Sequence, residues 1–313
     1  MRVLVAGATG AIGRQLIPGL VAAGHEVVGM VRSPGKRDAL SELGASAVIA
    51  DALVAEQVAQ AVAEARPEVI VHELTAIPEA LDMRHFDREF AMTNRLRTEG
   101  TDHLLSAGQA IGVRRFVAQS YAGWPFARSG ATVKTEIDEL DPHPVASMRR
   151  TLEALRHLEQ AVTGATWTEG VVLRYGALYG PGTSLGHGGQ HTALIAKRKF
   201  PVVGSGAGVW SFVHVVDAAE ATVAAVEQGE RGIYHVVDDD PAPVGQWLPA
   251  AAAALGARKP QRVPRWLGRV LAGEAAAVMM TEVRGASNAK AKRVLGWQPR
   301  FASWRDAFAH ELT

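Results

Sequence analysis

Cysteine is absent from this chain of 313 residues. Without thiols, the protein has no disulfide framework, thiolate zinc site, iron–sulfur cluster or cysteine nucleophile. The absence also fits a reducing compartment. The chain opens on an apolar strand pattern that lacks the length and cleavage site of a signal peptide. We therefore expect a cytoplasmic protein.

An excess of either charge is missing too. The 33 Lys and Arg residues nearly balance the 32 Asp and Glu residues, which gives a formal net charge of +1. No global field therefore draws the chain to nucleic acid or to an anionic membrane. No uncharged apolar run approaches the roughly 20 residues that span a bilayer. We expect no nucleic-acid or membrane partner, and any charged ligand has to be held by a local group of residues.

What the chain does have is the composition of a soluble globular enzyme, with 48% hydrophobic and 21% charged residues. In the first half, short β-branched runs alternate with amphipathic stretches, a pattern that predicts βαβ units and a parallel sheet. The predicted strands are residues 3–6, 25–31, 45–50, 69–72, 115–119 and 170–173, and the predicted helices include 14–23, 55–65 and 98–112.

A glycine-rich segment joins the first predicted strand to the first helix. Its glycines recur every three residues, which permits a tight turn, close approach of backbone to a pyrophosphate and close packing of helix on sheet. The helix N-terminus adds free N–H groups and a partial positive charge. We predict that a dinucleotide binds to this segment, which comprises Gly7, Ala8, Thr9, Gly10, Ala11, Ile12 and Gly13.

The end of the second predicted strand distinguishes NADP from NAD. An acidic residue there would favour NAD, but the sequence offers no carboxylate between Arg32 and Arg37. Arg32 can clamp a 2′-phosphate, with Ser33 and Lys36 as further donors. We expect NADP, with NAD as the alternative. After the third strand, Asp51 and Ala52 are expected to border the cofactor, and Asp51 is placed either to accept from the adenine amine or to cap the next helix.

Taken in order, these segments resemble the extended short-chain dehydrogenases/reductases of the NAD-dependent epimerase/dehydratase type. The resemblance covers essentially the whole chain. It implies a cofactor laid across the carboxyl edge of the sheet, with Leu74, Thr75, Ala76 and Tyr175 among the residues beside it. The other segments that carry the resemblance are 69–72, 100–101, 115–120, 173–182, 203–206, 212–217 and 295–299.

The fold class expected from the pattern and the resemblance is α/β: a Rossmann-type doubly wound parallel sheet with a smaller, mostly helical C-terminal substrate lobe. We predict that residues 1–174 form the NADP-binding domain and that residues 209–237 return to it. Residues 175–208 and 238–313 then form the substrate-binding lobe, because glycine and proline punctuation after Arg174 is followed by helical patterns from Val244 onward.

The resemblance breaks at the residues that transfer protons. Redox members of the family carry a tyrosine and, four residues later, a lysine that lowers the pKa of the tyrosine. None of the four tyrosines here is followed by lysine at that spacing. Alignment on Glu159 puts Thr151 in the tyrosine position and Leu155 in the lysine position. A threonine alone is no acid at neutral pH, so Thr151 can serve only as a relay.

Two residues at the end of the fifth predicted strand are further candidates for proton transfer. Strict counting places Tyr121 where the family has a serine or threonine, and Ser120 lies one residue earlier. Tyr121 is either a relocated acid or an aromatic side chain that fills the space left by smaller helix residues. The candidate catalytic residues are therefore Ser120, Tyr121 and Thr151.

A glycine-rich loop contains two histidines. Residues 182–186 match the G-x-S-x-G pattern of serine hydrolases, but this loop lacks the sharp strand-to-helix turn which that chemistry needs. His187 and His191 are four residues apart, yet Gly188 and Gly189 oppose a helix and no carboxylate lies between them, so we expect no metal site. We expect both histidines to line the substrate cleft.

These observations support a hypothesis of an NAD(P)-dependent oxidoreductase that acts on a carbonyl or hydroxyl group of a small molecule. Two alternatives stay open. The chain could be a noncatalytic NADP-binding sensor or regulatory protein, or an epimerase or dehydratase that recycles its cofactor internally. The sequence names no substrate, and it leaves a homodimer open.

Overall fold

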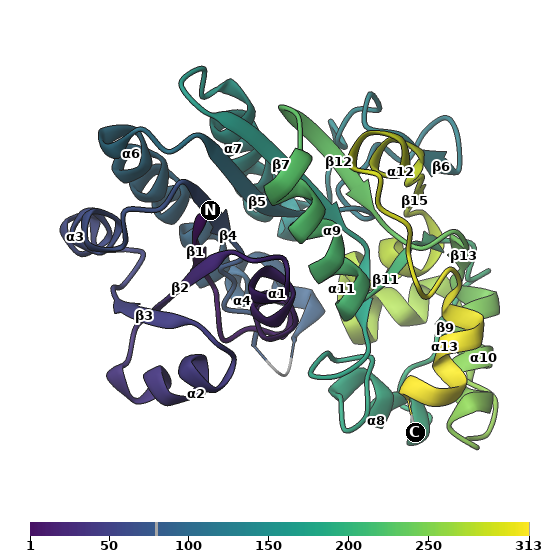
Figure 1. Ribbon diagram of the computed structural model, residues 1–313. Coiled ribbons are helices and arrows are strands. Elements are labelled where there is room, and N and C mark those ends of the chain that lie inside the picture. Colours follow the sequence, from purple (N-terminus) through teal and green to yellow (C-terminus); the bar gives the residue numbers. More distant parts are fainter. Residues whose placement is uncertain (79–80, 313) are drawn as a thin grey trace.

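A seven-stranded parallel sheet forms the centre of the protein, whose computed structural model describes residues 1–78 and 81–312 (Figure 1). The strand order β12-β7-β5-β4-β1-β2-β3 reverses between β1 and β4, the kind of switch point at which doubly wound sheets bind ligands. The expected fold class is confirmed. The strands are β1 (Arg2–Ala6), β2 (Glu26–Val31), β3 (Ser46–Ile49), β4 (Val69–His72), β5 (Arg115–Tyr121), β7 (Glu169–Tyr175) and β12 (Gly232–Val236).

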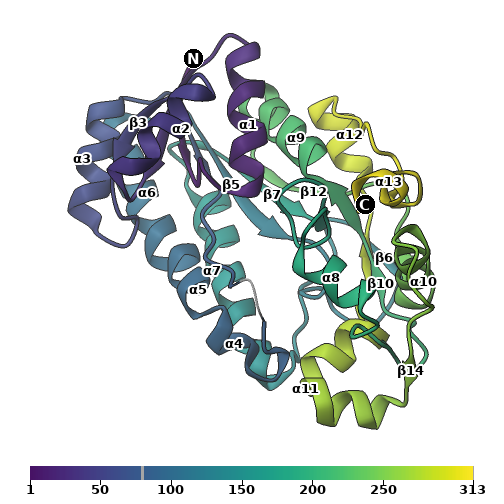
Figure 2. The same cartoon turned by 90° about the horizontal axis from the view of Figure 1, so that it is seen from below.

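Helices cover both faces of this sheet, because its strands are apolar on both sides. In β1, Val3 and Val5 pack with α1 (Ala11–Ala22) and α9 (Val215–Gln228), whereas Leu4 packs on the opposite face. That opposite layer consists of α3 (Ala55–Ala65), α6 (Thr101–Ile111) and α7 (Arg149–Gly164). Figure 2 shows the two layers on either side of the strands.

Helix α1 begins at Ala11, three residues before the predicted start at Arg14, because the glycine-rich segment itself forms the first turn. Another difference lies ahead of α6. One helical stretch runs through α4 (Phe86–Glu89) and α5 (Ala91–Arg95) and then widens into a π-helical turn, Leu96–Gly100.

Within residues 209–237, β12 joins the main sheet, while β11 (Phe212–His214) pairs in parallel with β8 (Ala177–Tyr179) beside it.

A C-terminal lobe packs beside the carboxyl edge of the sheet. It is built around a cluster of aromatic side chains that includes Phe212, Trp247, Trp304 and Phe308. The strands β10 (Val209–Trp210) and β13 (Ala242–Pro243) pair antiparallel within it. Its helices are α8 (Gln190–Ala196), α10 (Val244–Ala254), α11 (Arg265–Thr281) and α13 (Trp304–Glu311).

Helix α11 is kinked at Gly273, where φ is +89°. A Cβ at this position would lie 2.8 Å from the Cα of Arg84, so a residue with a side chain would push the two segments apart. The glycine therefore allows α11 to pack against residues 83–85. In the part of the chain that the structure describes, no helix is long and apolar enough to span a membrane.

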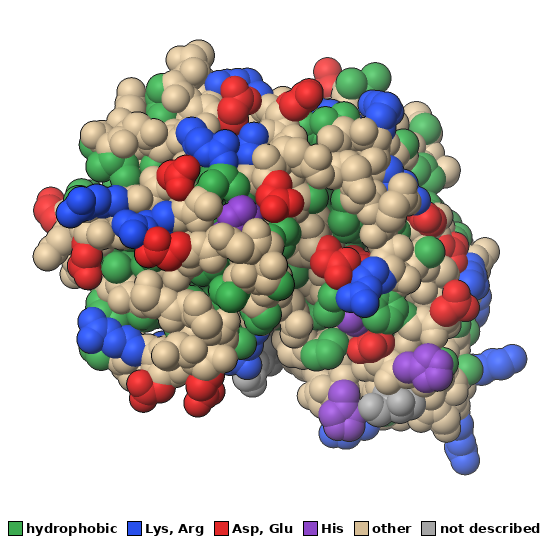
Figure 3. Space-filling model, viewed as in Figure 1, with side chains coloured by type: hydrophobic (Ala, Val, Ile, Leu, Met, Phe, Trp, Pro, Cys, Tyr) green, Lys and Arg blue, Asp and Glu red, His purple; other side chains and the backbone are tan. Residues whose placement is uncertain are grey.

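Charged side chains of both signs are interspersed over the face shown in Figure 3. This distribution agrees with the near-zero net charge of the chain.

Asp217, at the start of α9, joins the sheet domain to the C-terminal segment. Its carboxylate is fully buried and accepts hydrogen bonds from the backbone N–H groups of Arg300, at 2.8 Å, and Phe301, at 3.0 Å. The indole of Trp297 donates to the backbone carbonyl of Asp217 at 3.1 Å. These three bonds hold the segment that leads into α13.

Replacing Asp217 tests this junction. In Asp217→Asn, an NH2 group faces one of the two backbone N–H groups, so we expect the free energy of unfolding to fall by about 2 kcal/mol. Urea unfolding measures the change. The control is Glu220→Gln on the same helix, where an exposed carboxylate pairs with the Arg300 side chain; it should stay within about 0.5 kcal/mol of wild type. Equal losses in both variants would contradict the assignment.

Candidate functional site

The glycine-rich loop has the geometry of a phosphate cradle. Gly7 adopts φ +101°, and a Cβ there would lie 2.6 Å from the backbone carbon of Glu73. A Cβ on Gly13 would lie 2.4 Å from the carbonyl oxygen of Gly7. Helix α1 starts after Gly10 with no side-chain cap and no acidic residue in its first turn. The free N–H groups of this turn fit a pyrophosphate, so the residues present suit a dinucleotide.

The loop after β2 carries cations that no acidic group neutralises. Arg32, Ser33 and Lys36 are all exposed. Among the described residues, the side chains of Arg32 and Lys36 form no hydrogen bond or ion pair. Both cations are therefore available to a phosphate group of a ligand.

Asp51 and Ala52 lie at the end of β3. The Asp51 carboxylate accepts from the backbone N–H of Leu53 at 3.0 Å and so holds the turn that leads to α3. The N-cap of α3 is Val54, which corrects the alternative that Asp51 caps this helix. Ala52 is buried in the hydrophobic cluster between the sheet and the helices α3 and α6.

Beyond β4, the predicted cofactor residues border the edge of the sheet. Leu74 and Ala76 are half-buried and Thr75 is exposed. The N–H of Ala76 donates to the hydroxyl of Thr93 at 3.0 Å, which ties this segment to α5.

Glu73 is a buried carboxyl group directly beneath the glycine-rich loop, and sequence reasoning missed it. Its Oε1 lies 2.9 Å from the Tyr175 hydroxyl, which lies 2.6 Å from the Thr222 hydroxyl. The Thr222 hydroxyl donates to the carbonyl of Ala218 at 2.7 Å. These three contacts need three protons, and the two hydroxyl groups supply only two. The third proton therefore belongs to Glu73.

Burial acts on Glu73 in the same direction, because it raises the pKa of this carboxyl to about 8. At neutral pH, Glu73 is consequently mostly neutral, so its side chain places little negative charge under the phosphate cradle. The same contacts place the Tyr175 hydroxyl below the edge of the sheet. The signal in the sequence was an acidic residue at the end of the apolar run 69–72, although the run alone does not reveal what the carboxyl contacts.

Ser120 is held in a buried ion-pair cluster. Its hydroxyl donates to Glu159 Oε1 at 2.6 Å. Arg174 donates to both Glu159 oxygens, at 2.7 and 2.6 Å. The hydroxyl of Ser120 therefore belongs to the contact between α7 and β7, on the opposite side of β5 from its neighbour Tyr121.

Thr151 lies at the N-terminus of α7, where Asp87 caps the helix. The Asp87 carboxylate accepts from the backbone N–H groups of Arg150, at 3.0 Å, and Thr151, at 2.9 Å, and from the Thr151 hydroxyl at 2.7 Å. The side-chain amide of Asn94 donates to the Thr151 hydroxyl oxygen at 3.0 Å. The hydroxyl is thus already engaged as donor and acceptor. Leu155, one turn further along, is buried and apolar.

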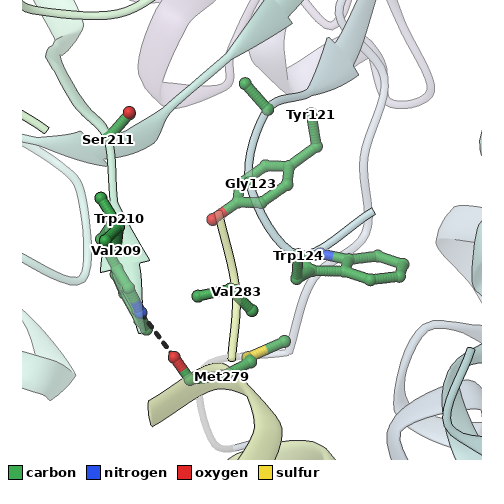
Figure 4. A pocket seen from close by; sticks show the side chains of 9 residues that line it. Tyr121, Gly123, Trp124, Val209, Trp210, Ser211, Met279 and Val283 are labelled. Carbon is green, nitrogen blue, oxygen red and sulfur yellow. Dashed lines mark hydrogen bonds between the residues drawn. The ribbon is translucent and has the colours of Figure 1, made fainter. Parts of the chain in front are cut away.

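Tyr121 extends from the end of β5 into a small pocket between the sheet and the C-terminal lobe. Figure 4 shows its hydroxyl directed at the space beside Val283, while Trp210 lies across the pocket and donates to the carbonyl of Met279 at 2.9 Å. The Tyr121 pocket has an inner volume of only about 20 Å³. It is lined by Tyr121, Ala122, Gly123, Trp124, Val209, Trp210, Ser211, Met279 and Val283.

The surroundings of Tyr121 decide its charge. Burial raises the pKa of the phenol to about 12, so the hydroxyl keeps its proton at neutral pH and can donate but not act as a base. The ring lies 6.4 Å from that of Trp124. Trp124 in turn makes an edge contact with Phe86, which stacks on Phe90 at 4.4 Å. An aromatic wall of four side chains therefore runs from the pocket to α5.

The two predicted cleft histidines lie on and before α8. His187 is exposed. His191 contacts the Ser184 hydroxyl at 3.2 Å, and its ring lies 5.4 Å from that of Phe200. Burial lowers the pKa of His191, so its ring is neutral at neutral pH. Neither histidine lines the Tyr121 pocket.

Comparisons with known proteins find similarity over most of the chain. Residues 3–237 match the model of the NAD dependent epimerase/dehydratase family. A 3-diazoavenalumate denitrifying reductase from Streptomyces sp is 45% identical over 323 residues, which cover 99% of this chain and 100% of the relative. A UDP-glucose 4-epimerase from Mycolicibacterium smegmatis is 28% identical and covers 96% of this chain and 95% of its own length.

Solved structures are similar along the whole chain. The UDP-glucose 4-epimerase of Thermotoga maritima, solved with UDP-glucose, has a TM-score of 0.78 at 21% identity and covers 100% of this chain and 97% of its own. Human epimerase family protein SDR39U1 (isoform 2), solved with NADPH, has a TM-score of 0.77 at 22% identity, with 100% and 99% covered. At these identities, the likeness shows the fold alone.

The protonation of Glu73 is testable through the pH dependence of stability. The folded protein keeps this proton up to about pH 8, whereas the unfolded chain releases it near pH 4.5. Between these values the folded state binds more protons, so stability falls as the pH rises. Relative to Glu73→Gln, which mimics the neutral acid, wild type should lose up to about 1.4 kcal/mol of unfolding free energy per pH unit in this window.

Urea unfolding of wild type and Glu73→Gln at several pH values checks this expectation. Glu64→Gln, which changes an exposed glutamate on α3, is the control and should follow the wild-type curve. If the curves of wild type and Glu73→Gln run parallel from pH 4.5 to 8, Glu73 is not protonated in the folded state.

Proposed function

The chain belongs to the NAD-dependent epimerase/dehydratase family, and from this premise we propose that it is an NADPH-dependent reductase of an electron-poor aromatic small molecule, with a diazo-type group as the leading acceptor. Its relatives show an enzyme of the oxidoreductase or epimerase type. The choice of NADPH as cofactor and the class of substrate go beyond what these relatives show.

The first part of the proposal is the binding of NADP(H). Residues 7–13 would hold the pyrophosphate at the start of α1, and Arg32, Ser33 and Lys36 would hold the 2′-phosphate. When bound, the nicotinamide supplies a hydride. The two exposed cations after β2 support NADP over NAD, because neither has an acidic partner among the described residues.

The observation that carries the proposed reaction is that the proton-transfer positions hold groups unable to transfer a proton. The Thr151 hydroxyl is bound to Asp87 and Asn94, and Leu155 is apolar. Reducing a carbonyl leaves an alkoxide that needs a proton, which these positions do not supply. An acceptor that needs only a hydride avoids this requirement.

A diazonium group is such an acceptor. An aryl diazonium ion that accepts one hydride loses N2 and leaves the arene, so atoms and charge balance with no proton from the protein. The relative with 45% identity over the whole chain is named as a denitrifying reductase of a diazo compound. This name supports the same chemistry here.

The Tyr121 pocket supports an aromatic substrate. Tyr121, Trp124 and Trp210 offer ring faces and edges, which favour aromatic partners. The space inside the pocket is about 20 Å³, enough for roughly one water molecule and far below the roughly 300–1,000 Å³ of a usual ligand site. A nucleotide sugar is much larger than this space, and an aromatic ring enters the pocket only if its lining side chains move.

The reaction is tested with purified protein, NADPH and a carboxyl-substituted benzenediazonium salt. We expect NADPH oxidation with one N2 released per NADPH, above the rate with heat-denatured protein. A panel of aryl ketones and UDP-glucose runs in parallel. Ketone reduction without N2 release would show that the acceptor is a carbonyl and not a diazo group. Conversion of UDP-glucose without NADPH consumption would indicate an epimerase. NADPH binding with no turnover would indicate a sensor.

Carbonyl reduction is the second candidate, because the neutral Tyr121 hydroxyl points into the pocket and can donate a proton. Tyr121→Phe separates the two reactions. If Tyr121 is the acid, we expect kcat for a ketone to fall roughly 10²- to 10⁴-fold. For the diazonium salt we expect less than about a ten-fold fall, because no proton transfer is involved. A large loss with the diazonium salt would contradict the proposed mechanism.

Arg32 is tested separately through cofactor affinity. Arg32→Ala removes a charged donor to the 2′-phosphate, so we expect the Kd of NADPH to rise about ten-fold or more while that of NADH stays unchanged. Tryptophan fluorescence titration measures both constants. Lys259→Ala changes an exposed cation of the C-terminal lobe and serves as the control. Equal losses for NADPH and NADH would rule out the 2′-phosphate contact.

A further inference from the structure

Arg97 carries a buried guanidinium to which the described part of the chain offers no hydrogen-bond acceptor. Only 7% of the residue is exposed, and its Nη1 is buried and unpaired. Among the described residues, no group accepts a hydrogen bond from its guanidinium. The charge of Glu159 acts on Arg97, but Arg174 and Ser120 already bind that carboxylate. Burial lowers the pKa of Arg97 to about 10 but leaves it charged at neutral pH.

A buried cation of this kind is costly unless something pairs with it. The ring of Phe90, 6.0 Å from the guanidinium carbon, offers a weak cation–π contact only. Arg97 also lies in the π-helical turn 96–100, a rare local structure that is frequent at functional sites. The guanidinium of Arg97 therefore has donors that a water or a bound ligand can satisfy.

Asn94 lies one helical turn earlier and has an unpaired acceptor. The Thr151 hydroxyl donates its only proton to Asp87, so the contact between Asn94 and Thr151 needs an N–H from the amide of Asn94. This requirement fixes the orientation of the amide. The Oδ1 of Asn94 then remains buried and without a partner.

The unpaired donor and the unpaired acceptor lie on one helical stretch, and both border α7. The side chain of Asn94 donates to the hydroxyl of Thr151, which lies on the same face of α7 as Leu155. Arg97 touches Phe90 at the end of the aromatic wall that leads from the Tyr121 pocket. The pair therefore lies close to Thr151 and Leu155, the two positions at which the chain lacks the tyrosine and the lysine of the family.

We propose that Asn94 and Arg97 form a subsite for the hydroxyl groups of a bound ligand. A hydroxyl donates to Asn94 Oδ1 and accepts from the Arg97 guanidinium, which satisfies both buried groups. Hydroxyls of this kind occur on the ribose at the nicotinamide end of the cofactor and on hydroxylated substrates. The subsite rests on the proposed function, and it would replace the contacts that the missing lysine and tyrosine cannot make.

The test measures binding without turnover, by fluorescence titration of NADPH and of 2′,5′-ADP, which lacks the nicotinamide half. In Arg97→Met we expect the Kd of NADPH to rise about ten-fold or more, while the Kd of 2′,5′-ADP stays within two-fold. The Tm of the ligand-free variant should stay equal or rise, because an unpaired buried charge is removed. Arg97→Lys should lie between wild type and Arg97→Met.

Arg95→Met is the matched control, because Arg95 lies on the same helical stretch but is exposed and paired with Glu99. It should change neither Kd. If Arg97→Met leaves the Kd of NADPH unchanged but raises the KM of a hydroxylated substrate, the subsite binds substrate. If neither constant changes, the subsite is overturned. If wild type binds neither NADPH nor 2′,5′-ADP, the proposed function fails instead.

Discussion

The ion pair between Glu159 and Arg174 is buried between α7 and β7, and the geometry of the site depends on it. Removing one partner of such a pair leaves an uncompensated charge, which costs roughly 3–5 kcal/mol. The pair also binds the hydroxyl of Ser120 at the end of β5. It thereby fixes the distance of α7 from the two central strands, and with it the positions of Thr151 and Leu155 beside the edge of the sheet.

In the same region, polar groups that could otherwise transfer protons are already engaged in hydrogen bonds within the protein. Asp87 and Asn94 engage the Thr151 hydroxyl, and the Glu159 carboxylate engages that of Ser120. Among the candidate catalytic residues, only Tyr121 directs a hydroxyl into the pocket. A site with so little proton-transfer capacity suits chemistry in which the acceptor takes a hydride and then needs no acid from the protein.

The charges around the proposed cofactor site favour an anionic ligand. The exposed cations after β2 and the free N–H groups of α1 favour phosphate, while burial keeps Glu73 mostly neutral beneath the same loop. Arg97 adds a buried positive charge in the π-helical turn that packs against α7. A chain with a net charge of +1 can thus bind an anionic dinucleotide, because local groups and not the overall field decide the affinity.

The sequence by itself determined the parallel sheet, the glycine-rich loop and the absence of a Tyr-x-x-x-Lys pair. Each of these depends on residues close together in the chain: β-branched runs give strands, and glycines at 7 and 13 are needed where a Cβ would collide with backbone. The tertiary structure alone decided that Asp87 engages Thr151, that Glu73 is protonated, and that Asn94 and Arg97 keep unpaired buried groups. These properties depend on partners 50 or more residues away, such as Thr151 for Asn94 and Tyr175 for Glu73. Local patterns carry no information about such partners, because burial and pairing arise only when distant helices and strands pack together.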